Sequence, residues 1–411
     1  MSAVPRPAAP FPAAVVGVGM SKFQTKRDDL DLTGLYQEGA VLALADAGLD
    51  MADIDMVVLA QSPDALHGIG HPEQTAAGAL GLHGVPLMRV NTGGATGASA
   101  VQAGWWAVAS GRSAACLVLG AEKMGDATRG AQEVLNKIWD PPYESALPLN
   151  TIVMCAMQAI RYMDRYGATE EHFALSAARM RTDGARNEYA HLRTPMTVDA
   201  VLATPYLAYP TRLAMACPRT TGACAMVIVN ADLARRLSAP KAWVRGFAAR
   251  ANTYFMGDKM GDCGPNDHGL YYDLHLAAQS AYAMAGITRP AEQIRLVEPY
   301  IPFSVMEPAQ LEALGMCGPG EAPKLAEIGH FDSDGPLPVC PSGGVLCANP
   351  ISISAMNRVA EAAQQVRGRC GAHQVDGVHT ALGAGAGGSV QFFTVGIFST
   401  DPDEECRRYP T

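Results

Sequence analysis

Short apolar runs alternate with helix-like segments through the first 120 residues of the chain. Each run has the length of a β-strand, and the segments between them have apolar residues at helical spacing. This succession predicts a buried sheet of parallel strands with helices on its faces, which is the α/β class. The predicted strands cover 13–18, 55–60, 86–91 and 114–120, and the predicted helices cover 33–48, a segment after Pro72, and 95–110.

The second half of the chain repeats this order more faintly. In both halves a turn of small residues precedes a predicted helix: Gly93-Gly94 in the first half and Gly343-Gly344 in the second. The repeat suggests a duplicated α/β unit. The predicted elements of the second half are a strand at 294–298, a helix from 341 to about 367 and two strands between 379 and 397.

The length of 411 residues suits two packed α/β domains. Residues 121–215 lack the strand–helix rhythm and are rich in Met, Tyr, Arg and Pro, which is typical of an inserted loop domain that covers a substrate. We therefore predict an N-terminal half made of 1–120 and 216–240, an insertion at 121–215 and a C-terminal half at 241–411.

Composition excludes several classes of function. A net charge of −9 gives no electrostatic reason to bind nucleic acid. No stretch approaches the ~18 apolar residues of a membrane span, and we expect the Ala- and Pro-rich start at 1–12 to be a loose tail, not a signal peptide. The ten cysteines form no Cys-x-x-Cys pair, so we expect neither disulfides nor a metal site. These features predict a cytoplasmic protein.

Four segments resemble, in order, those of the sterol-carrier-protein-x branch of the thiolase superfamily. They are Val90-Asn91 to Ala100, Gly120-Ala121-Glu122-Lys123-Met124, Asn187-Glu188-Tyr189-Ala190-His191 to Pro195, and Ala208 to Ala223 with its Cys217-Pro218 pair. The resemblance covers nearly the whole chain. It implies a thiolase fold, in which two duplicated α/β units form a layered α-β-α-β-α core with an inserted loop domain.

The catalytic positions of this family are the ones at which the chain differs. Gly94 stands where the family has its nucleophilic cysteine, so a covalent acyl-enzyme cannot form there. Tyr300 and Asn349 replace the histidines of the His-Asp-Cys-Phe and Gly-His-Pro motifs. The family's Cys-x-Gly-Gly turn becomes Gly385-Ala386-Gly387-Gly388, which lacks the second cysteine.

Hydrogen-bond donors that suit an oxyanion remain. Backbone N–H groups near Gly94, Gly385 and Gly387, together with the Asn349 amide, are candidates to hold a thioester oxygen as an enolate forms. An enolate is the leaving group of a retro-aldol cleavage, which needs no covalent intermediate. Tyr300 is then the candidate acid or base.

This combination resembles the thiolase-like aldolases of bacterial steroid side-chain degradation, which also lack the cysteine and carry a tyrosine at the Tyr300 position. Their second tyrosine corresponds to Ala386 here, and Tyr254, Tyr271, Tyr272 or a water molecule is the candidate substitute. The resemblance implies a lyase that cleaves a β-hydroxyacyl-CoA into a shortened acyl-CoA and a ketone or aldehyde. Coenzyme A is then part of the substrate and no bound cofactor.

Two other functions stay open. One is a non-catalytic subunit that binds a CoA thioester for a partner, and the other is an acyltransferase with a relocated cysteine. Cys347, two residues before Asn349, is a candidate substrate-binding residue, although its apolar neighbours favour packing in the core.

Assembly is the last expectation. The run 114–120 is apolar and uncharged, so we predict an edge strand that pairs across a two-fold axis in a homodimer. The resemblance also implies a small OB-fold/zinc-ribbon partner that binds each chain and completes the CoA site, giving a heterotetramer.

Overall fold

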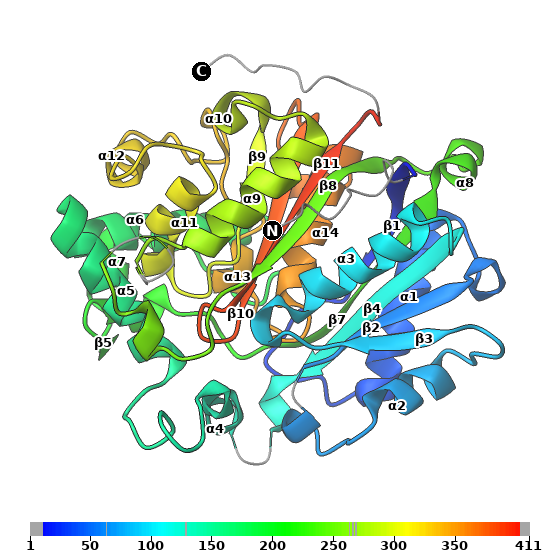
Figure 1. Cartoon of the computed structure of the whole chain (residues 1–411), viewed down its shortest axis with the longest axis horizontal. Helices are drawn as coiled ribbons and strands as arrows, with labels where there is room; N and C mark the ends of the chain where they lie inside the picture. The colour runs from blue at the N-terminus through cyan, green and yellow to red at the C-terminus, as the bar shows by residue number, and fades with distance from the viewer. Residues whose placement is uncertain are drawn as a thin grey trace, which may run out of the picture.

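A sheet of nine hydrogen-bonded strands passes through the whole structure, a computed structural model that describes residues 11–62, 64–127, 130–262, 264, 267 and 269–402 (Figure 1). The strand order is β3-β2-β4-β7-β1-β8-β11-β10-β9. The strands are β1 (Ala13–Met20), β2 (Met56–Ala60), β3 (Leu87–Val90), β4 (Ala115–Lys123), β7 (Thr221–Asn230), β8 (Ala242–Ala251), β9 (Leu296–Glu298), β10 (Thr380–Gly387) and β11 (Phe392–Ser399).

Helices cover the two faces of the sheet and fill its middle. The longer ones are α1 (Leu32–Ala47), α2 (Pro72–Ala79), α3 (Thr96–Ala109), α5 (Thr151–Tyr166), α6 (Glu170–Gly184), α9 (Tyr272–Ala285), α11 (Glu307–Ala313) and α14 (Ser354–Arg367). The shorter ones are α4 (Ala131–Leu135), α7 (Val198–Leu202), α8 (Ala231–Arg236), α10 (Pro290–Gln293), α12 (Ala322–Glu327) and α13 (Gly344–Cys347).

The sheet bends between β1 and β8, where only two residue pairs, Ala14 with Trp243 and Val15 with Ala242, join its halves. The central helices α3 and α14 lie side by side between the halves, α1 packs on β1, β4 and β7, and α9 packs on β8 and β11 (Figure 1). This arrangement confirms the predicted layered α-β-α-β-α core.

The sheet is mixed, so the expectation of parallel strands is wrong in part. Only β2 with β3 and β4, and β9 with β10, are parallel. Two of the antiparallel pairs are a hairpin of β10 with β11 and the pairing of β7 with β4 after the long excursion at 124–220. The sequence pattern indicated neither β7 nor β8.

The predicted helix from 341 to 367 is broken into α13 and α14, and Asn349 lies in the break. Pro350 explains the interruption, because the residue before a proline avoids helical backbone and proline itself lacks the N–H that a helix needs. The break puts Asn349 in a loop, where its side chain forms hydrogen bonds with Cys217 and Ser354.

The predicted edge strand is also wrong. β4 lies between β2 and β7, and the ends of the described sheet are β3 and β9. An apolar, uncharged run marks a strand that is buried on both faces, as β4 is, whereas β3 is only partly buried and its Met88 is 44% exposed. A free edge for pairing is therefore on β3.

The segment between β4 and β7 is mostly helical and includes a small hairpin of β5 (Tyr206–Ala208) and β6 (Thr211–Arg212). It contacts the second half of the chain, since the N–H groups of His191 and Leu192 both donate to the carbonyl of Cys347, at 3.1 and 2.9 Å. This contact brings α5 and α6 next to the α13–α14 break.

Within the described ranges, no helix combines the length and the apolar character needed to cross a membrane. Residues 1–10 of the predicted tail lie outside the described residues.

Candidate active site

Two glycine turns from the two halves of the chain meet at the centre of the molecule. A Cβ added to Gly387, at the end of β10, would lie 2.4 Å from both Thr92 O and Ala95 N. Gly93 has a positive φ of 62°, and a Cβ there would lie 3.0 Å from Gly388 N. Side chains cannot fit between the turns, so the backbone itself forms this part of the site.

Tyr300 fills the space beside Gly94. A Cβ added to Gly94 would lie 2.8 Å from the Tyr300 hydroxyl oxygen and 2.7 Å from Ala386 O. Both distances are far shorter than a normal contact to a side-chain carbon. A side-chain carbon at Gly94 would therefore collide with the tyrosine hydroxyl, and the glycine and the tyrosine depend on each other.

The hydroxyl group of Tyr300 is buried and keeps its proton at neutral pH. Tyr300 follows β9, its side chain is 5% exposed, and its carbonyl accepts a 2.8 Å hydrogen bond from Gln310 Nε2. Burial raises the pKa of the phenol well above its ordinary value, although a hydrogen bond with Ser354 acts in the opposite direction. The phenol is therefore protonated at neutral pH.

Asn349 is oriented by three hydrogen bonds. Its Oδ1 accepts from Ser354 Oγ at 2.6 Å, its backbone N–H donates to Thr220 Oγ1 at 3.0 Å, and its Nδ2 donates to Cys217 Sγ at 3.0 Å. An amide nitrogen carries two donors, so one N–H remains for a ligand. Ser354, at the start of α14, thus connects Tyr300 with Asn349.

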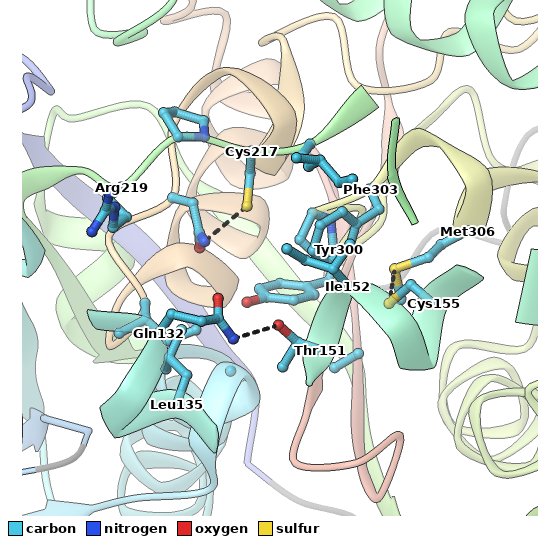
Figure 2. A pocket seen from close by; sticks show the side chains of 18 of the residues that line it. Gln132, Leu135, Thr151, Ile152, Cys155, Cys217, Arg219, Tyr300, Phe303 and Met306 are labelled. Carbon is cyan, nitrogen blue, oxygen red and sulfur yellow. Dashed lines mark hydrogen bonds between the residues drawn. The ribbon is translucent and has the colours of Figure 1, made fainter. Parts of the chain in front are cut away.

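These groups line a cavity of about 980 Å³. Figure 2 shows the Tyr300 side chain reaching into it, with Cys217 on one side and Thr151 and Gln132 on the other. The lining is mainly apolar, with contributions from α4, α5, the loops before β7 and after β9, and both glycine turns; it includes Gly94, Leu135, Ile152, Met154, Phe303, Met306, Asn349, Ile351, Ala386 and Gly387.

Two predicted site residues lie outside this cavity. A Cβ on Gly385 would meet Thr394 Oγ1 and the Ala98 Cβ, so this glycine packs β10 against its neighbours. Cys347 is fully buried and its thiol contacts Met180 O at 3.3 Å; burial raises its pKa to about 12. The structure therefore does not bring these two residues to the other candidate site residues, and their contact with substrate stays a prediction.

Of the three tyrosines suggested as substitutes at Ala386, only Tyr271 lines the cavity. Its hydroxyl donates to Gln158 Oε1 at 2.7 Å, and burial raises its pKa well above the ordinary value. Tyr254 and Tyr272 are exposed. Tyr271 is therefore a second protonated phenol beside the substrate space.

Sequence reasoning missed the polar group around Cys217. His191 lines the cavity, its ring nitrogens lie 3.0 Å from the hydroxyls of Thr25 and Thr220, and burial lowers its pKa. Cys217 is partly buried, and burial raises its pKa to about 12 despite the Asn349 bond. Both residues lie in segments that carried the family resemblance, but nothing in those segments showed that they meet.

One cluster of metal-ligand types exists among the described residues, and it lies away from the cavity. It comprises Glu361, Cys370 and His373, all buried. Burial opposes the charged form of both groups, but the contact between His373 Nε2 and Glu361 Oε2 at 3.0 Å outweighs it, so the pKa of the imidazole is raised and that of the carboxyl is lowered. The ion pair between His373 and Glu361 explains why these residues lie together. The expectation that the protein has no metal site stays a prediction.

Comparisons with known proteins agree with this architecture. The chain matches the thiolase N-terminal domain family over residues 13–199 and the thiolase C-terminal domain-like family over 267–400. It is 30% identical to an acetyl-CoA acetyltransferase of Methanothermobacter thermautotrophicus, across 94% of this chain and 99% of that protein. It is also 30% identical to a steroid side-chain-cleaving aldolase of Thermomonospora curvata, across 92% of this chain and 96% of that protein.

Among solved structures, the Ltp2-ChsH2(DUF35) aldolase superposes with a TM-score of 0.81 at 27% identity, covering 95% of this chain and 98% of that one. The similar proteins thus include an acetyltransferase and aldolases.

We expect Gly94→Ala to destabilise the protein by about 1–3 kcal/mol, the usual cost of forcing an extra carbon into a packed site. In a Tyr300→Phe background the loss should be smaller, because the hydroxyl 2.8 Å from the new carbon is gone. Denaturant unfolding of the four proteins of this double-mutant cycle measures the coupling. Gly78→Ala, where an added carbon has nothing within 4 Å, is the control. If the stability losses of the two single variants simply add in the double variant, Gly94 and Tyr300 do not depend on each other.

Proposed function

This chain belongs to the thiolase superfamily, and we propose that it is a CoA-dependent carbon–carbon lyase. It cleaves a β-hydroxyacyl-CoA into a shortened acyl-CoA and a ketone or aldehyde. The observation that carries the proposal is the protonated Tyr300 hydroxyl, which takes the place of a nucleophilic side chain at Gly94. A site with a proton donor and no activated nucleophile suits an enolate better than an acyl-enzyme.

The reaction is a retro-aldol cleavage. The β-hydroxyl loses its proton, the Cα–Cβ bond breaks, and its electrons form the thioester enolate while the β-carbon becomes a carbonyl. Because the Tyr300 phenol is already protonated, the β-hydroxyl proton moves to the phenol oxygen as Tyr300 gives its own proton to Cα, so the two transfers occur together with the bond cleavage. Because the proton lost at the hydroxyl equals the one gained at Cα, the cycle balances without a redox partner.

The enolate oxygen needs hydrogen-bond donors, and the cavity lining offers three candidates, two backbone N–H groups and one side-chain amide. The Gly94 N–H belongs to the turn that precedes α3, and Gly387, at the end of β10, packs against that turn. The second N–H of Asn349 Nδ2, which does not bind Cys217, belongs to the lining of the same cavity. Preorganised donors of this sort contribute about 2.7–4 kcal/mol each to the transition state.

The cavity suits a CoA thioester in size and charge. Its volume of about 980 Å³ is at the upper end of ligand sites, and exposed Arg193 and Arg219 line it, where they suit the phosphates of coenzyme A. The apolar wall suits a bulky hydrocarbon portion. Since a similar protein is a steroid side-chain-cleaving aldolase, a steroid side-chain thioester is the first substrate to test.

An acyltransferase is the second candidate, because Cys217 places a thiol in the cavity and a similar protein is an acetyltransferase. Burial holds the pKa of Cys217 at about 12, so little thiolate forms at neutral pH. Intact-mass spectrometry after incubation with an acyl-CoA separates the two functions. The absence of an adduct agrees with the lyase, whereas an acyl thioester on Cys217 would replace the lyase proposal with the acyltransferase.

We expect Tyr300→Phe to lower kcat by about 10²–10⁴-fold while acyl-CoA affinity changes little, because one proton-transfer group is lost and the ring remains. The assay quantifies the shortened acyl-CoA and the released carbonyl by mass spectrometry. Tyr272→Phe, which removes an exposed hydroxyl outside the cavity, is the matched control. Near-normal turnover of Tyr300→Phe would remove Tyr300 from the mechanism. If the wild-type protein shows no turnover either with or without a partner, a non-catalytic subunit is favoured.

We propose that the chain forms a homodimer through the free edge of β3. Light scattering should then give twice the chain mass of 43.2 kDa, and Met88→Asp, on that edge, should shift the protein toward the monomer. Met284→Asp, a similarly exposed methionine on α9, should leave the mass unchanged. A wild-type monomer would refute the dimer.

A small OB-fold/zinc-ribbon partner is the remaining part of the proposal, supported by similarity to the Ltp2-ChsH2(DUF35) aldolase. We expect the isolated chain to be weakly active and the added partner to raise kcat. Titrating a candidate partner into the cleavage assay measures the effect. Full activity without any partner would refute this part and leave the lyase intact.

A further inference from the structure

Arg181 is a buried cation that lines the cavity. It lies on α6, and its side chain is 8% exposed. Among the described residues, its one hydrogen bond runs from Nη2 to Ala214 O at a long 3.4 Å, and its Nε has no partner. A guanidinium has five N–H donors, so most of its hydrogen-bonding capacity is unused by the described protein.

The other buried arginines show what this chain normally does with such a charge. Arg358 pairs with the buried carboxylate of Glu298, and Arg367 pairs with Asp46 at 2.5 Å. A buried charge without an opposite charge is costly, so these pairs are the expected arrangement. Among the residues that the structure describes, Arg181 forms no such ion pair.

The surroundings of Arg181 contain no compensating negative charge. The described residues that line the cavity include Arg181, Arg193, Arg219 and His191 but neither Asp nor Glu. Cys347 and Cys217 lie near Arg181, but burial raises the pKa of both thiols to about 12, so neither supplies a negative charge at neutral pH. The cavity therefore favours a ligand that brings its own anion.

We propose that Arg181 binds a carboxylate carried by the acyl group of the substrate. This inference rests on the proposed function, since it assigns a subsite for the acyl part of a CoA thioester. A planar guanidinium matches one carboxylate with two parallel hydrogen bonds. The phosphates of coenzyme A carry more charge and more water, and they fit the exposed Arg193 and Arg219 better than a site with a single buried arginine.

Binding of paired ligands tests the subsite without any turnover. Succinyl-, glutaryl- and adipoyl-CoA each carry a terminal carboxylate, and butanoyl-, pentanoyl- and hexanoyl-CoA match them in chain length. Calorimetry with wild type should show at least one carboxylate-bearing member binding roughly 10- to 100-fold more tightly than its match. Arg181→Gln should abolish that preference and leave the affinity for free coenzyme A unchanged.

Arg193→Gln is the control for the alternative anion. It should weaken all the thioesters and free coenzyme A together while keeping the carboxylate preference. An Arg181→Gln protein that loses affinity for free coenzyme A to the same extent as for every thioester would assign Arg181 to a phosphate and overturn the proposal.

The wild-type measurement keeps the test decisive if Arg181→Gln fails to fold. Absence of any preference between the matched thioesters in wild type overturns the carboxylate subsite by itself. Conversely, wild type can prefer the carboxylate-bearing thioesters strongly, lose part of that preference in Arg181→Lys, and yet cleave no β-hydroxyacyl-CoA. That result would support the subsite and reject the lyase. The two proposals can therefore fail separately.

Discussion

The close approach of the two glycine turns is the constraint on which the rest of the site depends. Gly387 can lie against the Thr92–Ala95 turn only without a side chain, and Gly94 can lie against Tyr300 only under the same condition. The backbone donors and the phenol are therefore held by packing between the two halves of the chain. A packed arrangement of this kind keeps a donor in place before substrate arrives, which is what electrostatic catalysis requires.

Replacement of the thiol also changes the kind of chemistry that the fold can perform. A thiolate at a helix N-terminus needs a lowered pKa, whereas burial at this site raises the pKa of Tyr300, Tyr271 and Cys217. Each of these groups keeps its proton at neutral pH. The cavity is thus built to donate hydrogen bonds and protons to an anion that forms on the substrate.

Most elements could be predicted from the sequence, and the errors have physical causes. Apolar alternation located α1, α3 and β1, but β4 was taken for an edge because an apolar run does not show whether a strand has one neighbour or two. Motif positions identified Gly94, Tyr300, Asn349 and Gly387. Cys217, His191 and Arg181 were not recognised as site residues, because only tertiary packing brings α6 and the loop before β7 to the α13–α14 break.

The charge of the cavity connects the mechanism with the choice of substrate. A general base in such a site is usually a carboxylate or a histidine, yet the described lining has no carboxylate, and both ring nitrogens of His191 contact threonine hydroxyls. Proton transfer must then pass through neutral hydroxyl groups, with Tyr300 as the one beside the enolate donors. Negative charge that forms on the substrate meets cations, N–H donors and protonated hydroxyl groups but no carboxylate among the described lining residues, so the same electrostatic field that stabilises the enolate also attracts an anionic acyl group toward Arg181.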